Sequence, residues 1–123
     1  KINRKKFNDY LKKKLNINNV RNYYGLVEQI GSIFFECKCG YFIASNYSEV
    51  IIRDKNLDIC KVGKTGLVQL LSLLPSSYPG HNILTEDIGE IVNDSKCKCY
   101  GSGTRFLIHG RLKNAELRGC SNI

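Results

Sequence analysis

The sequence predicts an α+β fold that is mostly β: a helix over residues 1–15, then an antiparallel sheet or open, distorted barrel. Short runs rich in Val, Ile, Phe and Tyr recur after the helix, namely YFIAS, EVIIRD, GLVQLLSLL, EIVND and TRFLIHG. Gly, Asn, Asp and Ser separate them, which is typical of strands joined by tight turns. A length of 123 residues suits one domain. We therefore expect a single domain 1–123, with a β-rich body over 20–119 and a tail at 120–123.

The N-terminal segment has apolar residues at helical spacing, namely Phe7, Tyr10, Leu11 and Leu15. Residues 1–14 also carry six of the eight net positive charges. We expect a surface helix that packs by its apolar stripe and exposes its charges. A phosphate-binding patch is the alternative. Because basic and aromatic residues are not interleaved as in nucleic-acid motifs, no nucleic-acid partner is expected.

The composition is that of a folded globular chain, with 42% hydrophobic and 24% charged residues. No apolar run approaches the roughly 20 residues of a membrane-spanning helix. The longest candidate, GLVQLLSLLPSSYPG, is interrupted by Pro75. The basic start lacks the apolar block and cleavage site of a signal peptide, so we expect a cytoplasmic protein without a membrane span.

Four of the six cysteines form two C-x-C pairs, Cys37 with Cys39 and Cys97 with Cys99. In a cytoplasmic chain such cysteines favour metal binding or chemistry over disulfides. Two pairs brought together would offer four thiolates to one tetrahedral zinc ion. The spacing is shorter than in the usual zinc knuckle, so buried, metal-free thiols are the alternative. Structural roles are expected for the remaining candidates, Cys60, His81 and His109.

Three stretches in order, NYYGLVEQ, LTEDIGEI and HGRLKN, resemble the Y-G-x-T-E, T-G-D and G-R-x-D/K hinge motifs of adenylate-forming ligases. Val27 stands where Thr is usual. SSYPGHNILTEDIGEI, the second C-x-C pair, FLIHGR and AELRGCS are similar to the LuxE-type fatty-acyl-protein synthetases, whose close relatives are the phenylacetate–CoA ligases. The resemblance covers most of residues 20–119 and implies the C-terminal subdomain of such a ligase.

The resemblance implies a nucleotide-binding set formed by Tyr24, Gly25, Glu28, Asp87, Arg111 and Lys113. Tyr24 would stack on adenine, and Gly25 would let the backbone approach the nucleotide. Glu28 would hold the Mg²⁺ of ATP, and Asp87 would accept hydrogen bonds from the ribose hydroxyls. Arg111 would reach the ribose or phosphate, and Lys113 occupies the hinge position.

The resemblance also bears on the cysteines, because some phenylacetate–CoA ligases hold a structural zinc with a Cys/His/Cys/Cys set. No histidine follows Cys37 at the corresponding place here, and Cys39 is expected to replace it. The Gly/Ser/Thr-rich phosphate loop, which precedes the Y-G motif in the family, has no counterpart before residue 20. The chain is therefore expected to be a C-terminal portion, inactive in adenylation by itself.

The implied reaction uses ATP to convert a long-chain fatty acid into an acyl-adenylate, whose acyl group then passes to a cysteine and on to a partner acyl reductase. Cys120, in the family-like R-G-C-S stretch, is the expected acceptor, since Arg118, Arg111 and Lys113 nearby favour a thiolate. An idle terminal cysteine is the alternative. Two other functions stay open: a fragment of an aryl- or acyl-CoA ligase, and a non-catalytic, zinc-stapled interaction module.

Overall fold

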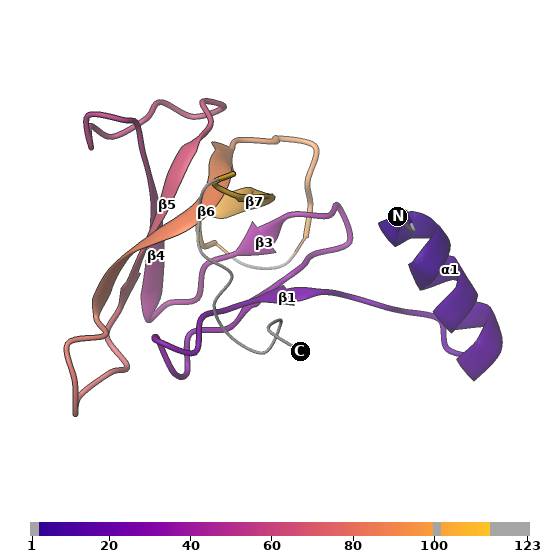
Figure 1. Cartoon of the computed structure of the whole chain (residues 1–123). Coiled ribbons are helices and arrows are strands. Elements are labelled where there is room, and N and C mark those ends of the chain that lie inside the picture. The colour runs from indigo at the N-terminus through magenta and orange to yellow at the C-terminus, as the bar shows by residue number, and fades with distance from the viewer. Residues whose placement is uncertain (1–2, 100–101, 114–123) are drawn as a thin grey trace.

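A computed structural model describes residues 3–99 and 102–113 (Figure 1). In these residues a single helix precedes two antiparallel sheets, which confirms the predicted, mostly β fold. The sheets stay open and do not close into a barrel. The elements are α1 (Arg4–Leu15), β1 (Tyr23–Tyr24), β2 (Phe34–Phe35), β3 (Phe42–Ile43), β4 (Ser48–Arg53), β5 (Gly66–Ser72), β6 (Asn82–Val92) and β7 (Arg105–Arg111).

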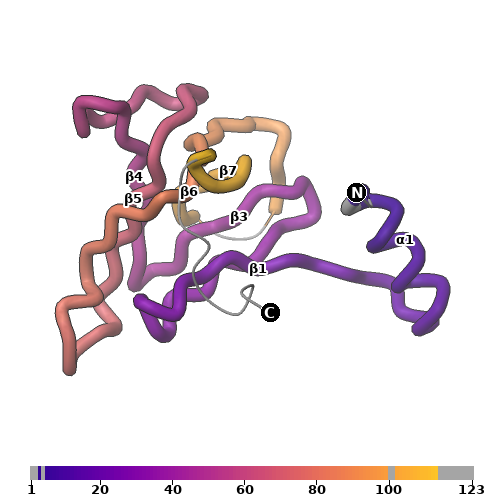
Figure 2. Tube along the Cα trace, in the orientation of Figure 1, coloured from indigo at the N-terminus to yellow at the C-terminus, as the bar shows by residue number. Residues whose placement is uncertain are grey.

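The larger sheet has the strand order β3-β7-β6-β5-β4, and β1 pairs with β2 in a separate two-stranded sheet. The trace in Figure 2 shows β4, β5 and β6 as a meander, with β7 returning beside β3. β5 has the alternation expected of a half-buried strand, since Val68, Leu70 and Ser72 are buried and the residues between them are partly exposed. Val68 and Leu70 therefore face the same core.

The core lies where the small sheet covers the larger one. Phe34 of β2 and Phe106 of β7 are both fully buried, with ring centroids 5.3 Å apart in an edge-to-face arrangement. Val68 and Leu70 of β5 belong to the same buried cluster. Aromatic packing of this kind fixes the small sheet, and with it the segment before residue 25, against the five-stranded sheet.

A register shift divides the β6–β7 pair between Ile88 and Gly89. Before the shift, Asp87 lies opposite Arg111; after it, Gly89 lies opposite Ile108. Gly89 is buried, and a Cβ atom there would collide with the Leu107 carbonyl oxygen. The bulge thus requires glycine, and it sets which side chains meet at the end of the hairpin.

Helix α1 is correctly predicted, but its packing is not. Asn3 caps its start through a side-chain oxygen 2.8 Å from the Lys5 backbone nitrogen, and Asn16 ends it in the left-handed conformation. Phe7, Tyr10 and Leu15 remain 48–60% exposed. An extended segment carries the helix away from the sheets (Figure 1), so its apolar stripe does not pack on the described body as the sequence suggested.

Candidate functional site

Three residues of the predicted nucleotide set meet on three different strands. The Tyr24 hydroxyl of β1 donates a hydrogen bond of 2.7 Å to Asp87 Oδ2 of β6. Arg111 Nε of β7 lies 3.6 Å from Asp87 Oδ1. Arg111 Nη2 also pairs with Glu86 Oε2 at 3.1 Å. The structure therefore gathers one residue from each of the three sequence motifs into one polar cluster.

The cluster has a protected and a solvent-facing side. The Asp87 side chain is only 15% exposed, whereas those of Glu86 and Arg111 are each 41% exposed. The Asp87 N–H donates to Thr85 Oγ1 at 3.0 Å, and that hydroxyl donates to the Val68 carbonyl at 2.8 Å. This arrangement offers a held carboxylate beside an accessible guanidinium, which suits a ligand that carries both hydroxyls and negative charge.

The raised pKa of Tyr24 should lower the free energy of unfolding at alkaline pH. Burial, then the hydrogen bond to Asp87 and its charge, raise the pKa of the Tyr24 phenol well above its ordinary value of about 10. Above that value the unfolded chain releases this proton while the folded chain retains it. The contribution of Tyr24 to the free energy of unfolding is therefore complete below about pH 10. Above that pH it declines by up to about 1.4 kcal/mol per pH unit.

Urea unfolding between about pH 9 and about pH 11 measures this decline in the free energy of unfolding. The Tyr24→Phe variant retains the other tyrosines and all lysines, so the difference between the two proteins isolates Tyr24. The variant should lose stability less steeply. Parallel pH profiles for the two proteins would contradict the assignment.

The remaining described members of the predicted nucleotide set are Gly25, Glu28 and Lys113, and Glu28 lies near the turn at Gly80. Gly25 follows Tyr24, and a Cβ atom there would come within 3.0 Å of the Ser32 carbonyl oxygen. Glu28 is exposed on the turn between β1 and β2. Lys113 is exposed just after β7. Cys120, the expected acyl acceptor, and Arg118 beside it lie outside the described residues.

Sequence reasoning missed Gln29, which anchors the turn that carries Glu28. Its side chain is fully buried and donates from Nε2 to the carbonyl oxygens of Gly80 at 2.8 Å and Leu70 at 3.4 Å. Ser32 and Ser72 add a buried hydroxyl–hydroxyl bond of 2.7 Å. A buried amide tied to two distant carbonyls has no pattern in the sequence that would reveal it.

The four cysteines of the two C-x-C pairs come together at the opposite end of β7. All four sulfur atoms lie within 4.8 Å of one another. The Cys37 and Cys97 sulfurs are 3.9 Å apart, and those of Cys39 and Cys99 are 3.6 Å apart. Four thiols at these distances match the donor set of a tetrahedral structural zinc site.

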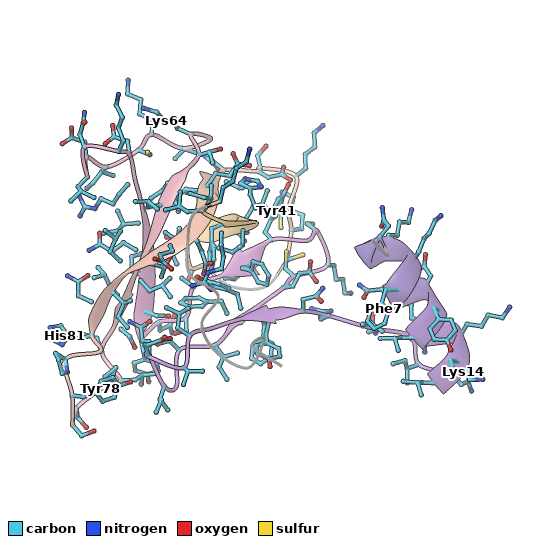
Figure 3. All side chains as sticks on the ribbon, viewed as in Figure 1. Phe7, Lys14, Tyr41, Lys64, Tyr78 and His81 are labelled. Atoms are coloured by element: carbon cyan, nitrogen blue, oxygen red, sulfur yellow. The ribbon has the colours of Figure 1, made fainter. Side chains whose placement is uncertain are left out.

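Two loops present these thiols. In the turn between β2 and β3, the Cys37 N–H donates to the Tyr41 carbonyl at 2.8 Å. In the loop after β6, the Cys97 N–H donates to the Asp94 carbonyl at 3.1 Å. The Tyr41 hydroxyl joins the two loops by donating to Asp94 Oδ2 at 2.9 Å, and Figure 3 shows Tyr41 beside sulfur atoms. Backbone bonds thus shape each loop, and the Tyr41–Asp94 side-chain bond joins the two loops that carry the cysteine pairs.

The pKa values of three of these thiols shift in different directions: that of Cys99 falls, and those of Cys37 and Cys39 rise. A hydrogen bond from the Cys39 backbone lowers the pKa of the Cys99 thiol to about 7. Hydrogen bonds with the Cys97 and Cys99 thiols raise the pKa of Cys39 to about 12, and burial raises that of Cys37. Four thiolates in contact repel one another, so a divalent cation is the natural partner for this donor set.

A basic groove of about 690 Å³ runs beside the thiols, and it was not anticipated from the sequence. Its lining includes four cationic residues, Arg21, Lys38, Lys96 and Lys98. A zinc ion with four thiolates carries a net charge of −2, which nearby cations would offset. Lys38 and Lys98 are the middle residues of the two C-x-C pairs. This alternation of cysteine and lysine is the sequence signal that could have indicated the groove.

The other candidates have structural surroundings. Cys60 is buried in the core cluster, and its N–H donates to the Ile52 carbonyl at 2.8 Å. His109 Nε2 lies 3.5 Å from Glu90 Oε1 on the neighbouring strand. His81 is exposed, and its carbonyl accepts from the Ser72 N–H at 2.9 Å. These contacts connect neighbouring strands and loops.

A family model described as acyl-protein synthetase, LuxE, matches residues 1–123. The chain belongs to this family of acyl-protein synthetases. Searches of curated proteins and of solved structures gave no significant match. Among the described residues, α1 is too short and too polar to cross a membrane.

Proposed function

We propose that the chain supplies the C-terminal portion of an ATP-dependent ligase that loads a long-chain fatty acid onto its own cysteine. The observation that carries this proposal is the meeting of Tyr24, Asp87 and Arg111, one from each motif, in a single polar cluster. Membership of the acyl-protein synthetase family supports the same reaction class.

The reaction has two steps. In the first, the fatty-acid carboxylate attacks the α-phosphorus of ATP, and pyrophosphate leaves. In the second, the Cys120 thiolate attacks the acyl carbonyl; a C–S bond forms, the C–O bond to phosphate breaks, and AMP departs with the electron pair. Such covalent catalysis divides one difficult transfer into two easier ones. The thioester would then be passed to a partner acyl reductase.

The residues of the cluster bind and orient the nucleotide in this proposal. Asp87 accepts hydrogen bonds from the ribose hydroxyls, and Tyr24 with Gly25 borders the adenine. Arg111 contributes positive charge toward the ribose and phosphate, which suits its exposed guanidinium. Glu28, on the exposed turn, offers an oxygen ligand to the Mg²⁺ of ATP, and Lys113 marks the hinge.

The thiol cluster has a structural task in this proposal. Cys37, Cys39, Cys97 and Cys99 would hold zinc, which supplies a cross-link between the β2–β3 turn and the loop after β6. No step of acyl transfer involves this site.

The acceptor is tested by mass spectrometry of the full-length synthetase with ATP and palmitate. We expect an added palmitoyl mass on the peptide that contains Cys120, released by neutral hydroxylamine as expected for a thioester. The Cys120→Ser variant should lose this adduct and still release pyrophosphate, since activation precedes transfer. Unmodified protein that instead forms acyl-CoA when coenzyme A is added would contradict the proposal. By itself, the 123-residue chain should show no ATP–pyrophosphate exchange.

A further inference from the structure

Tyr24 and Asp87 form a contact that no sequence motif assigns. They lie 63 positions apart, and their hydrogen bond of 2.7 Å is partly buried. Asp87 is the carboxylate that the proposed function places against the ribose, so whatever holds it sets where that ligand can bind.

The Tyr24 ring is held in place by the core. Its centroid lies 6.1 Å from that of Phe34 and 6.0 Å from those of Phe42 and Phe106. Phe34 and Phe106 are fully buried. A ring packed on three others has little freedom, so the direction of its hydroxyl is preset before any ligand arrives.

The two oxygens of Asp87 have different surroundings. Oδ2 accepts the short bond from Tyr24, while Oδ1 lies 3.6 Å from Arg111 Nε, beyond a good hydrogen bond. The Asp87 backbone N–H is meanwhile fixed to Thr85 Oγ1. Oδ1 is therefore the oxygen with capacity to accept from a ligand hydroxyl, and it lies on the side of the accessible arginine.

We propose that Tyr24 is a positioning residue: its hydroxyl holds Asp87 Oδ2 so that Oδ1 is presented to the ribose hydroxyls of the nucleotide. This inference rests on the proposed nucleotide-binding role of Asp87. It gives the tyrosine of the YG motif a second task, through its hydroxyl, besides any contact that its ring makes with adenine. A phenylalanine at position 24 would retain the ring packing and lose only this task.

The test is an NMR titration of the whole chain with AMP and with 2′,3′-dideoxy-AMP, which lacks both ribose hydroxyls. Tyr24→Phe should weaken AMP binding about tenfold, in line with the loss of a hydrogen bond to a charged group. Binding of the dideoxy nucleotide should change less than twofold, because the bond at issue needs the hydroxyls. Tyr23→Phe, at the exposed neighbouring position, is the matched control and should leave both affinities unchanged.

A double-mutant cycle on chain stability tests the contact without a nucleotide. Tyr24→Phe and Asp87→Asn should be non-additive, with a coupling of about tenfold in the folding equilibrium constant. Additive effects, or equal weakening of both nucleotides by Tyr24→Phe, would overturn the positioning role and leave nucleotide binding intact. A chain that shows the coupling but binds no AMP would instead overturn the ribose-binding role of Asp87.

Discussion

Replacing Cys97 with serine is expected to abolish stoichiometric zinc binding and to destabilise the zinc-treated protein by about 4 kcal/mol. That figure is the stabilisation from a ligand present at about 1,000 times its dissociation constant. The unaltered chain should bind one zinc ion, because its four sulfurs lie within 4.8 Å of one another. Serine removes a soft thiolate from a set that needs all four. Metal analysis and urea unfolding, with and without zinc, measure the two effects.

Cys60→Ala is the matched control for this experiment. Cys60 is a buried cysteine of the same chain, but it belongs to the core cluster and not to the group of four sulfurs. Its loss should lower stability equally with and without zinc and leave the zinc content at one per chain. An unaltered chain that holds no zinc, or a Cys97→Ser variant that retains a full equivalent, would rule out the four-thiol site.

Replacing Phe106 with alanine is expected to destabilise the fold by about 3–5 kcal/mol, the range for deleting a buried aromatic side chain. Phe106 is fully buried, and its ring contacts Phe34, Phe42 and Tyr24. The cavity left by the missing ring would loosen the packing between the two sheets. The Tyr24 ring, which contacts Phe106, would then be held less firmly. Urea unfolding measures the loss in stability.

Phe35→Ala provides the comparison for Phe106→Ala. Phe35 is 64% exposed, on the outer side of β2, and is adjacent to the buried Phe34. Its removal should change the free energy of unfolding by less than about 1 kcal/mol, because little buried surface is lost. Similar losses for the two variants would show that the aromatic cluster does not form the centre of the core.

Much of the fold could be predicted because strand patterns are local. The alternation in β5 and the apolar runs of β4 and β7 appear directly in the sequence. β6 was predicted only over its end, EIVND, yet it begins at Asn82 and includes the whole LTEDIG motif. Its polar residues and bulge interrupt the alternation, so the pattern concealed most of the strand.

The site could be predicted only as far as residue type and spacing reach. The C-x-C pairs indicated four thiols that act together, and the structure places their sulfurs in one group. The bond between Tyr24 and Asp87 depends on how the small sheet lies on the large one, which no local pattern encodes. The packing of the Phe7 stripe was wrongly predicted because helical periodicity shows which face is apolar, and not what covers it.

Zinc bound by the four thiols should also change how fast the chain folds. Cys37 and Cys97 are 60 positions apart, and the segment between them contains β3, β4, β5 and β6. Bringing such distant residues together costs conformational entropy. This cost slows folding, as in other β proteins with non-local contacts. A metal captured early by both pairs would close this loop before the strands align. Folding of the chain should then be faster with zinc present at the start than with zinc added afterwards.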